Sequence, residues 1–139
     1  MILVADSGSS KTDWLLSGAG EQPLAFRSVG LNPYFLTEKE IVKVLQEQIP
    51  DLAAYAGSVE EIYFFGAGCS SPDRHEIVSN AISTIFPKSY ISVDSDLLAS
   101  AYATCGREKG FCCILGTGSN ISFFDGEEIH DGQHGLGYV

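Results

Sequence analysis

The first thirty residues hold three short apolar runs that are separated only by brief polar turns. The runs are Met1–Ala5, Trp14–Leu16 and Leu24–Val29, and the segment DSGSSKTD lies between the first two. Connections this short join antiparallel neighbours in a sheet. The N-terminal region is therefore predicted to be a three-stranded antiparallel meander whose first hairpin has a small polar tip.

Helical and strand patterns then alternate along the chain. Thr37 opens TEKE, a capping-box pattern that predicts a helix from about Glu38 to Gln48, with Pro50 as its stop. The further expected elements are a strand at Glu61–Phe65, a helix from Pro72 to about Ile85, a strand at Tyr90–Val93, a helix at Leu97–Cys105, and strands at Phe111–Leu115 and Ile121–Phe124. This order predicts an α/β domain with a mixed sheet and flanking helices.

The charge of the chain restricts its partners. Eighteen acidic and eight basic side chains give a formal net charge of -10, which disfavours binding to nucleic acid or to an anionic membrane. No apolar stretch is long enough to span a membrane and no signal peptide is evident, so a cytoplasmic protein is expected. The four cysteines show neither a CxxC pair nor zinc-ligand spacing, and Cys112 and Cys113 are expected to be core residues.

Three polar segments have the composition of a phosphoryl-transfer site. The first, Asp6 to Thr12, combines small residues with a carboxylate suited to hydrated Mg²⁺ and a lysine suited to phosphate oxygens. It is not a P-loop, because the GxxxxGK[ST] pattern is absent. An ordinary Ser- and Gly-rich hairpin turn explains the same residues equally well.

The other two segments follow later strands. Gly116 to Asn120 forms a second glycine turn, and two such turns facing one cleft would suit a nucleotide, although alone it is only a hairpin. Asp94 and Asp96 lie between a strand and a helix, where a carboxylate can accept a proton from a substrate hydroxyl. Either aspartate could instead merely cap the following helix.

Together these segments resemble one family. DSGSSKTDW resembles the first phosphate motif of the actin/hexokinase-like ATPases, especially the branch of N-acetylglucosamine kinases and BadF/BadG/BcrA/BcrD ATPases. VDSDLLASAYA, followed by GFCCILGTGSN, resembles the catalytic-aspartate helix and second phosphate motif of that branch, and HGLG resembles its GGWG segment. The resemblance implies a ribonuclease H-like, actin-like ATPase domain spanning residues 1–139, as the N-terminal part of a longer chain that lacks here its C-terminal domain.

The family resemblance implies a role for each matched residue. Asp96, rather than Asp94, would be the catalytic base, and Asp6 would help to position Mg²⁺. The residues implied for ATP binding are Asp6, Gly8, Ser9, Ser10, Lys11, Thr12, Gly116, Thr117, Gly118 and Ser119. Those implied for the sugar are Asn32, Gly66, Gly68, Asn120 and Gly135, with Ala67 and Cys69 beside them. His134 and Leu136 replace a glycine and a tryptophan of the family pattern near the sugar.

The implied activity is ATP-dependent phosphorylation of a sugar, by resemblance the 6-hydroxyl of N-acetylglucosamine or a related amino sugar. A homodimer of the full-length protein is compatible with this assignment, and the fragment alone is expected to be inactive. One alternative is an ATPase that activates a 2-hydroxyacyl-CoA dehydratase and whose cysteines hold an iron–sulfur cluster. Another is a non-catalytic, sugar-responsive regulator with the same fold, and a third is a structural α/β domain that binds no nucleotide.

Overall fold

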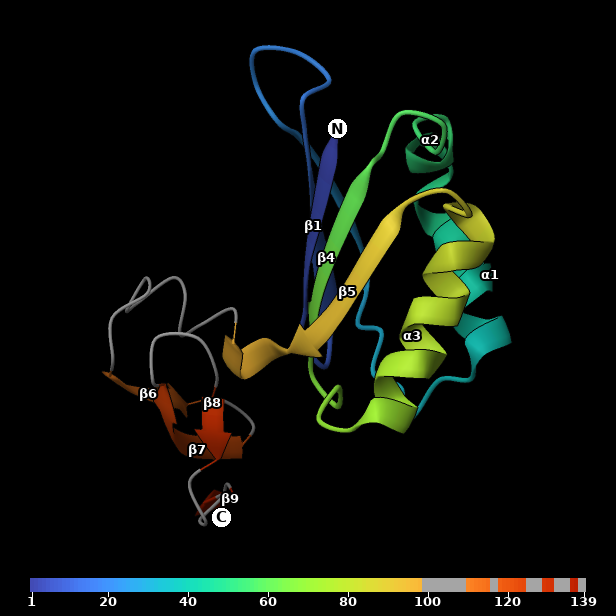
Figure 1. Ribbon diagram of the computed structural model, residues 1–139. Coiled ribbons are helices and arrows are strands. Elements are labelled where there is room, and N and C mark those ends of the chain that lie inside the picture. Colours follow the sequence, from blue (N-terminus) through green and yellow to red (C-terminus); the bar gives the residue numbers. More distant parts are fainter. Residues whose placement is uncertain (99–109, 116–117, 125–128, 132–135, 138–139) are drawn as a thin grey trace. The chain divides into compact units, whose positions relative to one another are not determined.

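The computed structural model describes residues 1–98, 110–115, 118–124, 129–131 and 136–137, with side chains described for residues 1–98 (Figure 1). The chain divides into two compact units, Met1–Asp96 and Leu97–Val139. Each unit is described by itself below.

A five-stranded sheet forms the centre of the first unit. Its strands are β1 (Ile2–Ser7), β2 (Lys11–Ser17), β3 (Leu24–Val29), β4 (Glu61–Gly66) and β5 (Tyr90–Ser95), in the spatial order β3-β2-β1-β4-β5. Strand β2 is antiparallel to both of its neighbours, whereas β1, β4 and β5 are parallel to one another. The predicted meander and mixed sheet are confirmed.

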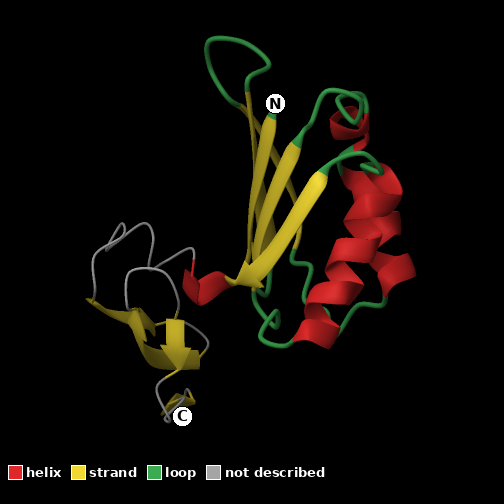
Figure 2. Cartoon of the chain, viewed as in Figure 1, coloured by secondary structure: helices red, strands yellow, loops and turns green. Residues whose placement is uncertain are grey.

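Helices α1 (Glu38–Gln48) and α3 (Pro72–Ile85) cover one face of this sheet, as Figure 2 shows. Helix α1 lies in the connection from β3 to β4, and α3 lies in the connection from β4 to β5. Right-handed crossovers that proceed in one direction along a sheet place their helices on the same face. Helix α1 begins with the predicted capping box, in which the Thr37 hydroxyl accepts from the Glu40 backbone N–H and the Glu40 carboxylate accepts from the Thr37 backbone N–H.

Burial alternates along β1 with the strand period of two. Leu3, Ala5 and Ser7 are buried on the helix-covered face, while Ile2, Val4 and Asp6 are exposed on the other face. The buried face joins the helices in one core around Trp14, Phe64 and Ile82. Successive side chains of β1 therefore lie on opposite faces of the sheet. At the end of the strand, Asp6 is on the exposed face and Ser7 is on the helix-covered face.

Several elements differ from their predicted bounds. Pro50 does follow the end of α1, but it also begins the short helix α2 (Pro50–Ala53), since proline suits the first position of a helix. Strands β1 and β5 both run two residues further than predicted, because their ladder pairs continue to Ser7 and Ser95. Residues 96–98 are helical, and the remainder of the helix predicted at Leu97–Cys105 lies outside the described residues.

The second unit contains an antiparallel sheet of four strands. They are β6 (Gly110–Leu115), β7 (Gly118–Phe124), β8 (Ile129–Asp131) and β9 (Leu136–Gly137), and β7 pairs with each of the other three. The β6–β7 pair was predicted, although β7 begins three residues earlier than expected, while β8 and β9 were not predicted. Within the described ranges, no helix is long and apolar enough to cross a bilayer.

Candidate active site at the carboxyl edge of the sheet

The three parallel strands of the first unit end level with one another. Ser7 of β1 pairs with Gly66 of β4, and Gly66 pairs in turn with Ser95 of β5. The polar segments that follow these strands therefore leave the sheet at the same edge. In open α/β sheets, ligands bind outside the carboxyl ends of the strands.

The tip of the first hairpin consists of residues 8–10. The backbone N–H of Gly8 donates to the carbonyl of Lys11 at 2.9 Å, which closes the turn. Ser9 and Ser10 are exposed, and their backbone N–H groups have no hydrogen-bond partner in the part of the chain that the structure describes. Exposed N–H groups in a turn of small residues are suited to binding phosphate oxygens.

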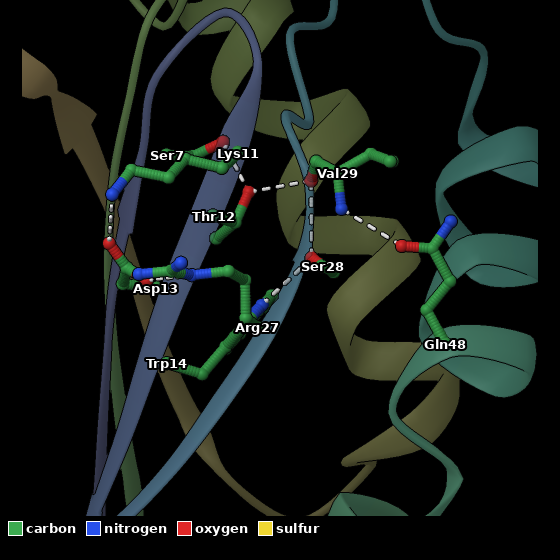
Figure 3. Close-up of polar contacts among 9 residues, drawn as sticks. All are labelled: Ser7, Lys11, Thr12, Asp13, Trp14, Arg27, Ser28, Val29 and Gln48. Atoms are coloured by element: carbon green, nitrogen blue, oxygen red, sulfur yellow. Dashed lines mark hydrogen bonds and ion pairs between the residues drawn. The ribbon is translucent and has the colours of Figure 1, made fainter.

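Below this tip, buried hydroxyls form a directed chain of hydrogen bonds (Figure 3). Thr12 Oγ1 donates its single hydrogen to the Val29 carbonyl at 2.9 Å, so it must accept from Ser7 Oγ, which lies 2.8 Å away. Ser7 Oγ in turn accepts from the Leu31 backbone N–H at 2.9 Å. The Thr12 side chain is completely buried, and its hydroxyl therefore holds β1, β2 and the start of the next loop together instead of facing a ligand.

A second chain of hydrogen bonds ends on the same carbonyl. Trp14 Nε1 donates to Ser28 Oγ at 3.1 Å, and Ser28 Oγ donates to the Val29 carbonyl at 3.1 Å. The Val29 backbone N–H donates to Gln48 Oε1 of α1 at 2.9 Å. Both polar groups of Val29 are thus fixed at the point where β3 ends, as Figure 3 shows.

Gly30 lies directly beneath the hairpin tip. A Cβ atom at this position would overlap the carbonyl oxygens of Gly8 and Ser9, the second at only 2.6 Å. These are backbone atoms, which cannot move aside as the end of a flexible side chain can. The tip at residues 8–10 therefore rests on a position that only glycine can occupy.

Lys11 shares a carboxylate with an arginine on the exposed face. Lys11 Nζ lies 3.3 Å from Asp13 Oδ2, and Arg27 Nε lies 2.7 Å from Asp13 Oδ1. The hydrogen bond from Arg27 is the main cause that lowers the pKa of Asp13, and Lys11 lowers it further. These side chains are largely exposed, so they form a solvent-accessible charged cluster beside the hairpin tip.

Two carboxylates stand in one row on this exposed face. Asp6 pairs in register with Phe65 of β4, and Phe65 pairs with Asp94 of β5. Two strand spacings separate Asp6 from Asp94, about 10 Å. Ser92 Oγ donates to Asp94 Oδ2 at 3.3 Å, and Asp6 is exposed.

The aspartates of the third polar segment lie near Cys69. This thiol is buried, and its pKa is raised to about 12, first by burial and then by the negative charges of Asp96 and Asp94. Both aspartates are partly buried. The loop that follows β4 and the end of β5 therefore face a common region, as expected from the level strand ends.

The structure also brings the loop at residues 30–34 against the loop at residues 66–71. An added Cβ at Gly68, whose φ is +79°, would collide with Asn32 Oδ1 and lie 2.9 Å from Tyr34 Cδ2. At Gly66 it would lie 2.5 Å from Phe64 Cε1. Two residues of α3 that no sequence motif marks contact these loops. Arg74 Nη1 donates to the Pro33 carbonyl, and His75 Nε2 is 2.7 Å from the Cys69 carbonyl oxygen.

The second glycine turn belongs to the second unit. Ser119 and Asn120 lie in β7, paired with Leu115 and Ile114 of β6, and Gly118 pairs with Gly137. Gly116, Thr117, Gly135 and His134 lie outside the described residues. The roles expected of this turn in binding nucleotide and sugar stay predictions.

The residues of the first unit fit a Mg²⁺–nucleotide pair. Among the described residues, no group of three or more His, Cys, Asp or Glu side chains gathers as a metal site. Magnesium in nucleotide sites is usually held by one or two carboxylates together with substrate phosphates and water. The exposed carboxylate of Asp6, two residues before the tip that carries the free N–H groups of Ser9 and Ser10, is a donor set of that kind.

Comparison with solved structures finds similar chains. A candidate N-acetylglucosamine kinase from Porphyromonas gingivalis is 40% identical to this chain, with a TM-score of 0.85, and the match covers 94% of this chain and 47% of that protein. YeaZ from Pseudomonas aeruginosa is 17% identical over 98% of this chain and 67% of its own, with a TM-score of 0.49. No protein-family model matches the sequence, and no curated protein matches it either.

Proposed function

The chain belongs to the same family as the candidate N-acetylglucosamine kinase of P. gingivalis and has the actin-like ATPase fold, and we propose that it is the N-terminal half of an ATP-dependent sugar kinase. The observation that carries this proposal is the 40% identity along nearly the whole chain. The chain spans 47% of the length of that relative, so the complete enzyme would contain a second half of similar size.

The first unit supports the proposal by what it gathers at one edge of its sheet. The hairpin tip offers backbone N–H groups, Lys11 offers a cation, and Asp6 offers a carboxylate. Asp94 lies near the end of β5 and Asp96 directly follows that strand, and both are close enough to Cys69 to raise the pKa of its thiol. Phosphoryl transfer needs positioning, charge neutralisation and one proton acceptor, and these groups are of the kinds that would supply all three.

In the proposed reaction, Asp96 accepts the proton of a sugar hydroxyl, the 6-hydroxyl in an amino sugar such as N-acetylglucosamine. A bond forms between that oxygen and the γ-phosphorus of ATP, while the bond from the γ-phosphorus to the bridging oxygen breaks and ADP leaves. Asp6 would hold Mg²⁺, which neutralises charge on the phosphate oxygens when bound. Gly8, Ser9, Ser10 and Lys11 would bind phosphates, with Thr12 fixing the turn, and Gly116, Thr117, Gly118 and Ser119 stay further candidates for phosphate binding.

The sugar would lie against the two loops that contact each other in the first unit. Asn32 would bind a sugar oxygen, with the backbone at Gly66 and Gly68 beside it, and Asn120 and Gly135 stay further candidates for sugar binding. Close packing of Gly68 against Asn32 supports a shared role for the two loops.

The test is an ATP-consumption assay of the full-length protein with a panel of hexoses and amino sugars. We expect turnover with N-acetylglucosamine or a close relative, and a loss of at least about 100-fold in kcat for Asp96→Asn, the usual scale for a general base. Asp94→Asn is the matched control, since the charge of Asp94 also raises the pKa of Cys69 but Asp94 is not the assigned base, and we expect it to lose less than Asp96→Asn.

Other outcomes would point elsewhere. Strong sugar turnover by Asp96→Asn would exclude Asp96 as the base, and loss of activity only in Asp94→Asn would transfer that role to Asp94. ATP hydrolysis that no sugar accelerates, by a brown iron-containing protein, would instead indicate an ATPase that activates a dehydratase. Sugar binding without ATP consumption would indicate a regulator.

A further inference from the structure

Arg74 ties the first turn of α3 to the loop between β3 and α1. Its Nη1 donates to the Pro33 carbonyl at 3.2 Å, and its guanidinium carbon lies 4.1 Å from the centroid of the Tyr34 ring. A hydrogen bond and a cation–π contact thus hold two consecutive residues of that loop. Lysine could not reproduce both contacts, because only the planar guanidinium can stack on a ring while donating in its own plane.

The residue before this pair is Asn32, and its side chain is fixed at one end. Asn32 Oδ1 accepts from the Tyr34 backbone N–H at 2.9 Å, while its backbone carbonyl accepts from Phe35 and Leu36, each at 3.0 Å. The other end of the carboxamide, Nδ2, has no hydrogen-bond partner among the described residues. Asn32 therefore presents two unpaired N–H donors, while its Oδ1 is held by the Tyr34 N–H.

Gly68, in the loop that follows β4, packs against Asn32 and Tyr34. Its φ of +79° is one that side-chain-bearing residues rarely adopt, and its missing side chain leaves the space that Asn32 Oδ1 and the Tyr34 ring occupy. The neighbouring Cys69 thiol is close enough to Asp94 and Asp96 for their charges to raise its pKa. Asn32 thus contacts Gly68, whose neighbour Cys69 is affected by the charge of the assigned base.

We propose that Arg74 is a positioning residue for the sugar: by holding Pro33 and Tyr34 it fixes the Asn32 carboxamide with its N–H donors directed to an acceptor oxygen of the substrate. The inference rests on the proposed sugar kinase function. It assigns no chemical step to Arg74, which acts only through the loop. The substrate group that it serves must offer an oxygen acceptor, either a hydroxyl or the carbonyl of an acetamido group.

The experiment compares variants of the full-length enzyme by KM for the sugar, KM for ATP and kcat. We expect Arg74→Ala to raise KM for N-acetylglucosamine about tenfold, the scale of one lost hydrogen bond to substrate, with KM for ATP changed less than twofold. Arg74→Lys should recover part of this loss. Tyr34→Phe should behave as wild type, because it retains both the ring and the backbone N–H, whereas Tyr34→Ala should raise the sugar KM.

Two matched controls separate this effect from general damage. Lys43→Ala removes an exposed cation of α1 that pairs with Glu47 at 4.0 Å, and Tyr90→Ala removes a tyrosine that is 63% exposed, against 57% for Tyr34. Both controls should leave both KM values unchanged. If Arg74→Ala does not fold, as judged by circular dichroism, Tyr34→Ala decides: a raised sugar KM supports the inference and an unchanged one overturns it.

The outcomes for the two proposals are distinct. If wild type phosphorylates a sugar but Arg74→Ala leaves the sugar KM unchanged, or raises both KM values equally, the positioning role is overturned and the kinase assignment stands. If wild type phosphorylates no sugar, both proposals are overturned together.

Discussion

Thr12→Val tests whether the buried hydroxyl chain stabilises the first unit. Valine has nearly the shape of threonine, so the change removes one hydroxyl and leaves the packing almost intact. The bond from Thr12 to the Val29 carbonyl is lost, and the Ser7 hydroxyl, which donates to Thr12, is left buried without an acceptor. The Val29 carbonyl itself keeps the bond from Ser28.

The expected cost follows from these contacts. The lost bond to Val29 contributes about 1 kcal/mol, and an unsatisfied buried hydroxyl costs about 2 kcal/mol. Burying the extra methyl group offsets less than about 1 kcal/mol of this. Thr12→Val should therefore lower the free energy of unfolding by about 2 kcal/mol. Thr12→Ser keeps the hydroxyl and loses only a methyl group, so it should cost about 1 kcal/mol.

Trp14 makes the measurement specific. It is the only tryptophan of the sequence, and it is buried in β2 beside Thr12, so its fluorescence during urea denaturation reports the unfolding of this unit. With an m value of about 1.5 kcal/mol/M, a loss of about 2 kcal/mol lowers the midpoint by about 1.3 M.

The control is Thr84→Val on α3. The Thr84 hydroxyl donates to the Asn80 carbonyl at 3.0 Å but is exposed, so the same chemical change should shift the stability by less than about 0.5 kcal/mol. If Thr12→Val costs no more than Thr84→Val, or if Thr12→Ser costs as much as Thr12→Val, the hydroxyl chain does not stabilise the unit as argued.

Three further predictions concern the glycines and Cys69. A Cβ at Gly8 would meet only the Lys11 carbonyl, at 3.7 Å, so Gly8→Ala should leave the urea midpoint unchanged but raise KM for ATP in the full-length enzyme about fivefold. The control Gly57→Ala, whose Cβ would have nothing within 4 Å, should change neither quantity. An unaltered KM for ATP in Gly8→Ala would remove Gly8 from the phosphate site. Gly30→Ala should cost about 2 kcal/mol by the same fluorescence assay, because its Cβ overlaps backbone atoms of the hairpin tip, and wild-type stability would contradict that geometry. Burial and two carboxylates raise the pKa of Cys69 from 9.0 to about 12. Between these pH values the unfolded thiol ionises and the folded one does not, so the contribution of Cys69 to the free energy of unfolding is complete below pH 9 and is lost as the pH rises toward 12. Peptide mass spectrometry should find Cys69 unalkylated by iodoacetamide in the native protein at pH 8, and rapid native labelling would refute the raised pKa.

Much of the first unit follows from local patterns. The capping box at Thr37 gives α1 with its observed bounds, and the three apolar runs of the first thirty residues give the meander. The short elements α2, β8 and β9 were missed because two to four residues contain no measurable period.

The details of the site depend on contacts that the sequence does not display. The extension of β1 to Ser7 puts the hydroxyls of Ser7 and Thr12 on the buried face, and no local signal distinguishes this from exposure to a ligand. Arg74 contacts Pro33 across 41 residues, so only the folded chain identifies it. Strands β1, β4 and β5 were predicted, and because they are parallel and end level, the polar segments that follow them leave the sheet at one edge.

Asp13 has two cations, and only one of them is close to the hairpin tip in sequence. If Lys11 turns toward an arriving polyphosphate, Arg27 remains within 2.7 Å of the same carboxylate. The Asp13 carboxylate then still has one cationic partner, so Lys11 can leave it without creating an unpaired charge. The Lys11 ammonium can therefore leave Asp13 for an anionic ligand and pair with Asp13 again when that ligand dissociates.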